Sequence, residues 1–360
     1  MIEKGRIVSH PGVYIKDAID ELGLTQSEFA LRSGLSIKNV STIINGESDI
    51  TFDAAVKLSN FFHNSVEGWI NLQTKYDLFL RETKRKQEYE DDWKVAKLFD
   101  KNFVSSCLGI RIEVKNKETV IDELRKGFNV GNLINLKHVD MYVFCKTSVK
   151  RDLDEKTIIM RNAWISLAEQ EARNISCQPF NKDILSNNIR YLRTLTLLEP
   201  KDFQPKLKRV LAEAGIKLVI LPFLPGSNVS GITKWIENEQ CVMVAINDCG
   251  KDADKIWFAI FHELGHAMQN HKRHMTISYR KGEIEDKEEN EANEFAKNSL
   301  INQRDYDSFV NKRMFDLRSI QKFAKEQQVA DFIVIGRLQK EEYVPWNKFQ
   351  SRKIKYVVDF

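Results

Sequence analysis

Apolar residues recur with the three-to-four-residue spacing of a helix over most of the chain. In residues 1–80, short helical patterns are separated by Gly and Ser, and a charge-rich run over 81–101 predicts one more helix. Later helical patterns lie around 163–168 and 189–198, and then at 253–271, 284–300, 315–328 and 329–341. The chain is therefore predicted to be mostly helical.

A second pattern, of short runs rich in β-branched residues, lies in the C-terminal half. The runs cover 217–221, 231–236 and 241–246, and Pro222, Pro225, Gly226 and Asn247 punctuate them. Such runs predict the strands of a small sheet. The expected fold class is α+β, mostly α.

Length and composition narrow the class of protein. The 360 residues correspond to two or three domains of ordinary size. No apolar run approaches the roughly 20 residues that cross a bilayer, and the first residues lack the apolar core of a signal peptide, so we expect a cytoplasmic protein that uses no membrane. The five cysteines are odd in number and form no CxxC pair, which argues against a disulfide framework and a cysteine zinc site.

Two short helices joined by a tight turn are predicted near the N-terminus. Thr25 and Glu28 have the spacing of a capping box, Gly34 interrupts the helix that they begin, and Ser36 caps the next one. This spacing suits a helix-turn-helix, whose second helix reads DNA, although an ordinary helical hairpin fits it equally well. Gln26 on the first helix suits a phosphate contact. The residues of the second helix suited to bases and phosphates are Ser36, Lys38, Asn39, Ser41 and Thr42.

Further residues give this N-terminal part a resemblance to the HigA-type antitoxin and repressor family. The resemblance rests on His10-Pro11-Gly12, Gln26-Ser27-Glu28, Ile43-Ile44-Asn45-Gly46, Ile50-Thr51, Trp69-Ile70-Asn71-Leu72-Gln73 and Tyr76-Asp77. It implies a five-helix, dimeric DNA-binding domain that represses its own operon. The implied partners are operator DNA and a second copy of the chain, and a toxin is a further candidate.

The distribution of charge bears on this expectation. The whole chain has a formal net charge of +4, but residues 1–80 hold seven Lys and Arg against ten Asp and Glu, a net charge of −3. Counterion release supplies most of the non-specific affinity for DNA. We therefore expect weak, salt-sensitive binding through a local basic face that includes Arg6, Arg32 and Lys38.

The C-terminal part contains an HExxH motif, His262-Glu263-Leu264-Gly265-His266. Two histidines four residues apart lie on one face of a helix, where both imidazoles reach one zinc ion. An apolar stripe from Trp257 to Met268 predicts such a helix. We therefore predict that His262 and His266 bind Zn²⁺ and that Glu263 is the general base that takes a proton from water.

A catalytic zinc needs a third protein ligand. Glu288 and Glu291 both lie on or beside the apolar face of the next predicted helix, and geometry leaves the choice between them open. The HExxH region together with Glu291-Ala292-Asn293-Glu294-Phe295-Ala296 resembles the ImmA/IrrE metallopeptidase family. That resemblance implies a zincin-like domain and assigns the third ligand to Glu291.

Two functions follow from these motifs. The first is a DNA-binding regulator with a zinc-dependent metallopeptidase that hydrolyses a regulatory protein, either a repressor or this chain itself. An extended peptide would then add to a strand edge at 230–236 or 241–246. The second is a non-proteolytic antitoxin or repressor whose zinc fold acts as a sensor or a docking surface. The general base Glu263 favours the first, because a scaffold has no need of one.

Four regions are predicted from these observations. They are a HigA-type helix-turn-helix domain at 1–80, a helical connecting region at 81–205, an ImmA/IrrE-like metallopeptidase domain at 206–310, and C-terminal helices with a basic tail at 311–360.

Overall fold

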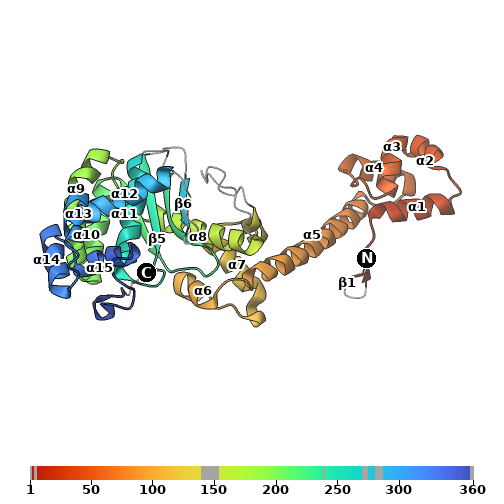
Figure 1. Ribbon diagram of the computed structural model, residues 1–360. Helices are drawn as coiled ribbons and strands as arrows, with labels where there is room; N and C mark the ends of the chain where they lie inside the picture. The colour runs from red at the N-terminus through yellow and green to blue at the C-terminus, as the bar shows by residue number, and fades with distance from the viewer. Residues whose placement is uncertain are drawn as a thin grey trace. The chain divides into compact units, whose positions relative to one another are not determined.

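The computed structural model (Figure 1) describes residues 2–3, 6–138, 154–236, 238, 240–269, 275–279 and 287–356. The chain divides into two compact units, Met1–Asp91 and Asp92–Phe360. The boundary lies inside one long helix, α5 (Val66–Ala96). The finer division into four regions stays a prediction.

The described part of the first unit is a bundle of helices preceded by a two-stranded ribbon. Its elements are β1 (Ile2–Glu3), β2 (Arg6–Ile7), α1 (Pro11–Glu21), α2 (Gln26–Ser33), α3 (Ile37–Ile44), α4 (Phe52–Phe62) and the first part of α5. The expected five-helix domain is thus present. Its core contains Phe29, Val40, Ile43, Leu58 and Trp69, all of them buried.

Local sequence signals set the turn between α2 and α3. Thr25 Oγ1 accepts a hydrogen bond from Glu28 N, and the Glu28 carboxylate accepts one from Thr25 N, so the predicted capping box is present. Gly34 ends α2 in the left-handed region at φ 77°, which glycine adopts without strain, and Ser36 Oγ caps α3. The helix-turn-helix prediction is confirmed.

Gly12 allows α1 to cross α3 closely. A Cβ atom at this position would lie 1.9 Å from Ile43 O, so any larger residue would separate the two helices. The position of α3, the predicted reading helix, therefore depends on a residue of α1.

The second unit begins with helical elements that precede its sheet. They are the end of α5, α6 (Lys101–Leu108), η1 (Val114–Asn116), α7 (Lys117–Gly127), η2 (Leu133–Lys137), α8 (Glu155–Arg173), α9 (Lys182–Thr194), η4 (Leu195–Leu197) and α10 (Pro200–Glu213). The buried Asp92 carboxylate joins three of them, because it accepts from Arg125 Nε at 2.7 Å and from Ile134 N at 2.9 Å.

The described strands of this unit form a mixed sheet in the order β3-β5-β4-β6. They are β3 (Ile216–Leu221), β4 (Val229–Ile236), β5 (Cys241–Asn247) and β6 (Met275–Tyr279). β3 runs parallel to β5, with Ile216 opposite Val242, whereas β4 is antiparallel to both β5 and β6. The small predicted sheet is confirmed, with β6 as a strand that the sequence pattern did not indicate.

This order corrects one expectation about substrate binding. β4 and β5 have neighbours on both sides, so the prediction that 230–236 or 241–246 offers a free strand edge is wrong. Among the strands that the structure describes, β3 and β6 are the outer ones. The spacing of apolar residues identified these strands but does not encode which of them pair.

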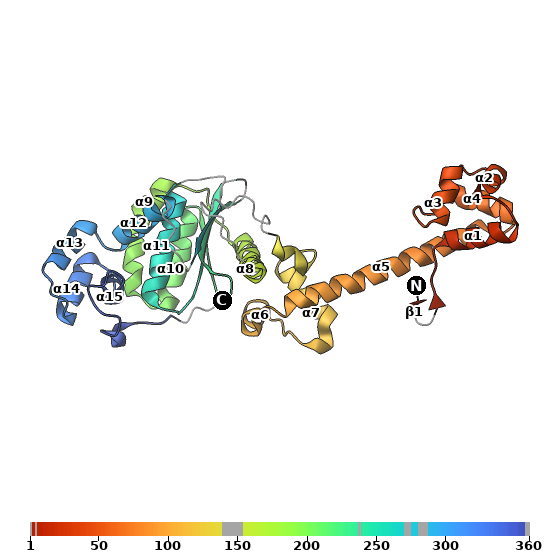
Figure 2. The ribbon, with the colours of Figure 1, turned by 45° about the vertical axis from the view of Figure 1, so that its right-hand side comes forward.

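Helices cover both faces of the sheet, as Figure 2 shows. Lys234 of β4 forms an ion pair with Glu169 of α8, and the adjacent Thr233 side chain points to the opposite face, toward α11 (Ala253–Gln269). α10 and α11 share that opposite face and enclose a continuous apolar core with β3 and β5.

Within the described residues, four helices and a short helical turn follow. They are α12 (Lys287–Leu300), α13 (Gln303–Asn311), α14 (Leu317–Gln327), α15 (Asp331–Lys340) and η5 (Gln350–Arg352). The segment after α15 returns to α11, where Trp257 Nε1 donates to Tyr356 Oη at 3.0 Å. Within the described ranges, no helix has the length and apolar character that a membrane span requires.

Candidate functional site

The HExxH motif lies in the middle of α11, between the sheet and α12. Both of its histidines and Glu263 are buried. Gly265 brings α12 close, since a Cβ atom there would lie 2.9 Å from Ala292 Cα. The motif therefore faces the first turns of α12 rather than solvent.

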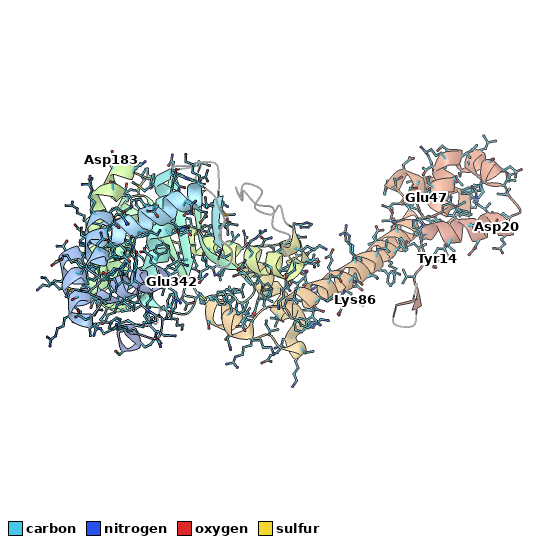
Figure 3. All side chains as sticks on the ribbon, viewed as in Figure 1. Tyr14, Asp20, Glu47, Lys86, Asp183 and Glu342 are labelled. Atoms are coloured by element: carbon cyan, nitrogen blue, oxygen red, sulfur yellow. The ribbon has the colours of Figure 1, made fainter. Side chains whose placement is uncertain are left out.

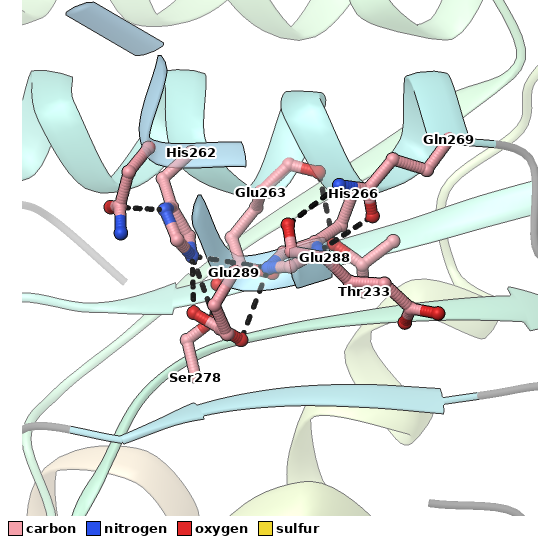
Figure 4. Close-up of polar contacts among 9 residues, drawn as sticks. Thr233, His262, Glu263, His266, Gln269, Ser278, Glu288 and Glu289 are labelled. Atoms are coloured by element: carbon pink, nitrogen blue, oxygen red, sulfur yellow. Dashed lines mark hydrogen bonds and ion pairs between the residues drawn. The ribbon is translucent and has the colours of Figure 1, made fainter. Parts of the chain in front are cut away.

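Among the residues that the structure describes, three possible metal ligands converge at this crossing (Figure 4): His262, His266 and Glu289. The two Nε2 atoms lie 3.1 Å apart, and each lies 3.3 Å from one oxygen of the Glu289 carboxylate. A tetrahedral zinc ion with bonds of about 2.0–2.1 Å separates its ligand atoms by about 3.3 Å. The residues present thus fit a metal of this size and geometry.

The remaining ring nitrogens of the histidines are fixed by amide oxygens. His262 Nδ1 lies 3.0 Å from Asn293 Oδ1, and His266 Nδ1 lies 3.1 Å from Gln269 Oε1. An amide oxygen accepts hydrogen bonds, so each Nδ1 donates and each Nε2 keeps its lone pair for a metal when the ring is neutral. Gln269 Nε2 also donates to Glu288 O at 2.7 Å, which ties the end of α11 to α12.

Proximity alters the protonation of these groups. Burial raises the pKa of the Glu289 carboxyl, but hydrogen bonds from His262 and His266 and their charges outweigh it and lower this pKa to about 2. Burial lowers the pKa of His266, yet the hydrogen bond to Glu289 and the charges of Glu263 and Glu289 hold it above its usual value. The site therefore attracts a positive charge, either a proton or a metal ion.

Glu291, which the resemblance assigned as the third ligand, does not reach this site. It lies two residues after Glu289, about 200° further around α12, and its exposed side chain pairs with Lys287 Nζ at 3.7 Å. The buried residues Ala292, Ala296 and Leu300 mark the face of α12 that packs inward. Glu289 precedes Ala292 by three residues and shares that face, so Glu289, and not Glu291, lies beside the two histidines.

Residues of the sheet hold Glu263, the predicted general base, in position. Its Oε2 accepts a hydrogen bond from Thr233 Oγ1 at 2.7 Å, and Thr233 Oγ1 also lies 3.0 Å from Glu263 O. Gly231 makes room for the other oxygen, because a Cβ atom at that position would lie 2.3 Å from Glu263 Oε1. Two residues of β4 therefore set the position of this carboxylate.

β6 supplies one more polar group. Ser278 Oγ lies 3.2 Å from His262 Nε2, so a hydroxyl stands beside one of the converging ligand atoms. No sequence pattern indicates Ser278, Thr233, Asn293 or Gln269, since their roles depend on which elements meet. The period of α12 could have identified Glu289, because the carboxylate three residues before Ala292 lies on the buried face.

The predicted DNA-contacting residues lie around the turn between α2 and α3. Gln26, Ser36 and Lys38 are exposed, and Asn39, Ser41 and Thr42 are half-buried. Thr42 Oγ1 donates to Asn39 O at 3.1 Å and accepts from Ser48 Oγ at 2.9 Å, which commits this hydroxyl to the fold.

The charge around this turn is mixed. Arg32 and Lys38 are exposed, whereas the side chain of Arg6 lies outside those that the structure describes. Acidic side chains such as Asp20 and Glu47 also project from the surface of the first unit, as Figure 3 shows. Part of the net negative charge of residues 1–80 therefore lies on the exposed surface of the first unit.

Comparisons with known proteins match both halves of the chain. The helix-turn-helix family matches residues 15–69, and the IrrE N-terminal-like domain matches residues 211–337. Virulence-associated protein A' of Dichelobacter nodosus is 44% identical over 70 residues, which are 19% of this chain and 61% of that protein. An uncharacterized HTH-type transcriptional regulator of Escherichia coli (strain K12), YddM, is 32% identical over 68 residues, 19% of this chain and 72% of its own.

Solved structures resemble the N-terminal part. A Nostoc punctiforme protein assigned to the antidote proteins of plasmid maintenance systems is 37% identical, with a TM-score of 0.23, over 23% of this chain and 91% of its own. The antitoxin HigA of Pseudomonas aeruginosa, solved with the higBA promoter, is 26% identical, with a TM-score of 0.22, over 24% of this chain and 94% of its own.

Proposed function

Since the chain belongs to the helix-turn-helix regulators through its N-terminal unit and carries an IrrE N-terminal-like domain, we propose that it is an operator-binding repressor with a zinc-dependent peptidase. One observation supports the proposed peptidase activity most directly. His262, His266 and Glu289 converge at the spacing of a tetrahedral site, and Glu263 adjoins them. Its substrate would be a regulatory protein, either another repressor or this chain.

The proposed reaction divides the chemistry between the metal and Glu263. Zinc held by His262, His266 and Glu289 would polarise a peptide carbonyl and lower the pKa of a water molecule. Glu263 would act as the general base and acid, taking a proton from water and returning it to the leaving amine. Thr233 orients Glu263 through its hydrogen bond to Oε2. The other oxygen, Oε1, lies beside Gly231 and is the atom that would take up and release the proton.

The peptidase is tested by comparing the native chain with Glu263→Gln, each loaded with zinc and incubated with candidate repressors. The amide keeps the shape of the side chain but cannot take a proton, so we expect cleavage to fall by at least 100-fold, at the lower end of the contribution of general-base catalysis. Metal content should be equal in the two proteins. If both proteins contain the same amount of metal and neither cleaves a repressor, the peptidase proposal is wrong. The non-proteolytic role would then remain, in which the zinc fold acts as a sensor or docking surface.

DNA binding is proposed for the exposed side of α3. Lys38 and the half-buried Asn39 are the candidates for phosphate and base contacts, and Gln26 at the start of α2 is a further phosphate contact. Two copies of the chain would bind a two-fold symmetric operator, and a toxin is a candidate third partner. These roles place the protein in the cytoplasm, where its operator lies.

This interface is tested by the retardation of operator fragments at low and moderate salt. The double variant Lys38→Ala with Asn39→Ala should lose binding at every salt concentration, because α3 then lacks its exposed cation and an amide. The control is Lys75→Ala, which removes the same charge from an exposed position of α5. Unchanged binding by the double variant would show that α3 is not part of the DNA interface.

A further inference from the structure

Two cysteines that are far apart in the sequence lie in contact in the second unit. The Sγ atoms of Cys177 and Cys241 are 3.0 Å apart, although 64 positions separate the residues. Both are thiols in the structure. A disulfide bond has an S–S length of about 2.05 Å, so the two sulfurs need to approach by roughly 1 Å to become bonded.

The backbone around both thiols is fixed. Cys241 is the first residue of β5 and pairs with Ile236 of β4. Cys177 belongs to the segment 175–181, which we call the strap, between α8 and α9. The strap is held by hydrogen bonds from Gln178 N to Ala212 O, from Phe180 N to Gln240 O and from Asn181 N to Ala214 O, of 3.0, 2.7 and 3.0 Å.

A glycine allows the strap to lie this close. Gly215 has φ 82°, and a Cβ atom there would lie 2.2 Å from Phe180 Cα, so the strap passes over a position with no side chain. Neither thiol can move far without breaking these contacts. The structure thus gives the pair a high effective concentration toward each other.

Among the described cysteines, Cys177 and Cys241 are the two whose sulfur atoms are in contact. Cys177 is half-buried and therefore within reach of a small oxidant, whereas Cys241 is buried. For the remote Cys107, burial, followed by the charges of Asp248 and Glu171, raises the pKa to about 12, so this thiol stays protonated and unreactive. Cys145 lies outside the described residues.

We propose that Cys177 and Cys241 are a modification site that a hydroperoxide oxidises to an intramolecular disulfide. The Cys177 sulfur attacks one oxygen of hydrogen peroxide, becomes a sulfenic acid and releases water. The Cys241 sulfur then attacks the Cys177 sulfur, the S–S bond forms, and the sulfenic oxygen leaves as a second water with the remaining thiol proton. Two thiols are oxidised and one peroxide is reduced to two waters. This site does not depend on the proposed peptidase.

The bond would fasten the strap to the end of β5. It would close a long loop, which restricts the unfolded chain and raises the unfolding temperature of the second unit by several degrees. Reduction by a dithiol would reverse the change, as for any accessible disulfide.

The test uses the full chain, reduced, freed of reductant and treated with a small excess of hydrogen peroxide. Alkylation and peptide mapping without reductant should show the loss of two of the five thiols and one linked peptide that joins Cys177 to Cys241. The yield should be independent of protein concentration, and the unfolding temperature should rise. A link to any other cysteine, dimers whose yield grows with concentration, or a sulfinic acid at Cys177 without a link would overturn the proposal.

Variants assign the order of the two steps. Cys241→Ser should leave a sulfenic acid at Cys177 that dimedone traps, and Cys177→Ser should leave Cys241 reduced. The matched controls Cys107→Ser and Cys249→Ser should form the link as the native chain does. Should Cys241→Ser fail to fold, the map of the native chain and the Cys177→Ser variant still decide the outcome.

Discussion

At the scale of single residues, the proposed metal site depends on which carboxylate reaches two fixed histidines. Glu289 and Glu291 are two positions apart on α12, but the first contacts both imidazoles and the second pairs with Lys287 at the surface. The hydrogen bonds of Asn293 and Gln269 to the Nδ1 atoms complete the site. The proposed site thus combines residues from α11 and α12.

Exchange of the two glutamates distinguishes their roles. Glu289→Gln should weaken zinc binding by about 100-fold or more, since loss of even an outer partner of a metal ligand costs about 10–100-fold. Glu291→Gln is the matched control and should bind zinc as the native chain does. Competition with a chromogenic chelator measures both affinities. The opposite ranking would restore Glu291 as the ligand.

At the scale of elements, the start of α2 provides a prediction about pH. Hydrogen bonds with the backbone and then the side chain of Thr25 lower the pKa of Glu28 below its usual 4.5. A lowered folded-state pKa means that this stabilisation is fully present above pH 4.5 and is lost as the pH falls through the lowered value. The unfolding temperature of the first unit should therefore fall below pH 4.5 more steeply in the native chain than in Glu28→Gln.

Removal of the cap gives an independent measure of the same element. Thr25→Ala deletes the hydroxyl that accepts from Glu28 N, so we expect a loss of about 1 kcal/mol in the free energy of unfolding of the first unit. Denaturant unfolding at neutral pH measures it. An unchanged stability, or identical acid profiles for the native chain and Glu28→Gln, would show that the capping box contributes nothing.

A second element-scale prediction concerns the crossing of α11 and α12. Gly265→Ala would place a Cβ atom 2.9 Å from Ala292 Cα, and backbone cannot yield as a flexible side chain can. We expect a loss of about 1–3 kcal/mol in the stability of the second unit and weaker zinc binding, because Glu289 moves with α12. Gly131→Ala is the control, since nothing lies within 4 Å of its added Cβ atom. Equal zinc affinity in the two variants would contradict this account.

At the scale of the whole molecule, the chain consists of two compact units that share α5. The proposed metal ligands belong to the second unit, and the helix-turn-helix belongs to the first. Each unit has an apolar core of its own. A ligand of one unit should therefore stabilise that unit alone.

Calorimetry tests this independence. We expect two unfolding transitions, and zinc should raise the temperature of only one of them. The unit that binds zinc should be stabilised by about 4 kcal/mol when free zinc is 1,000 times its dissociation constant. Glu289→Gln should abolish this shift and leave the other transition where it is. A single transition that moves as a whole on addition of zinc would mean that α5 couples the two units.

Much of the fold follows from local signals in the sequence. The capping box at Thr25, the turn at Gly34 and the runs that became β3, β4 and β5 are all short-range patterns, and each is present. β6 and α13 are among the elements that the sequence pattern did not predict. β6 is five residues long and is stabilised by pairing with β4, which no local pattern encodes.

The sequence by itself determined the two histidines and Glu263, because a spacing of four residues on a helix places the imidazoles on one face whatever surrounds it. The tertiary structure decided which carboxylate lies beside the histidines, the support of Glu263 by Thr233 and the contact of Cys177 with Cys241. Each of these joins residues from different elements. The positions of these residues depend on which faces of the elements pack together. For α12, the close approach of Gly265 to Ala292 determines which face packs against α11.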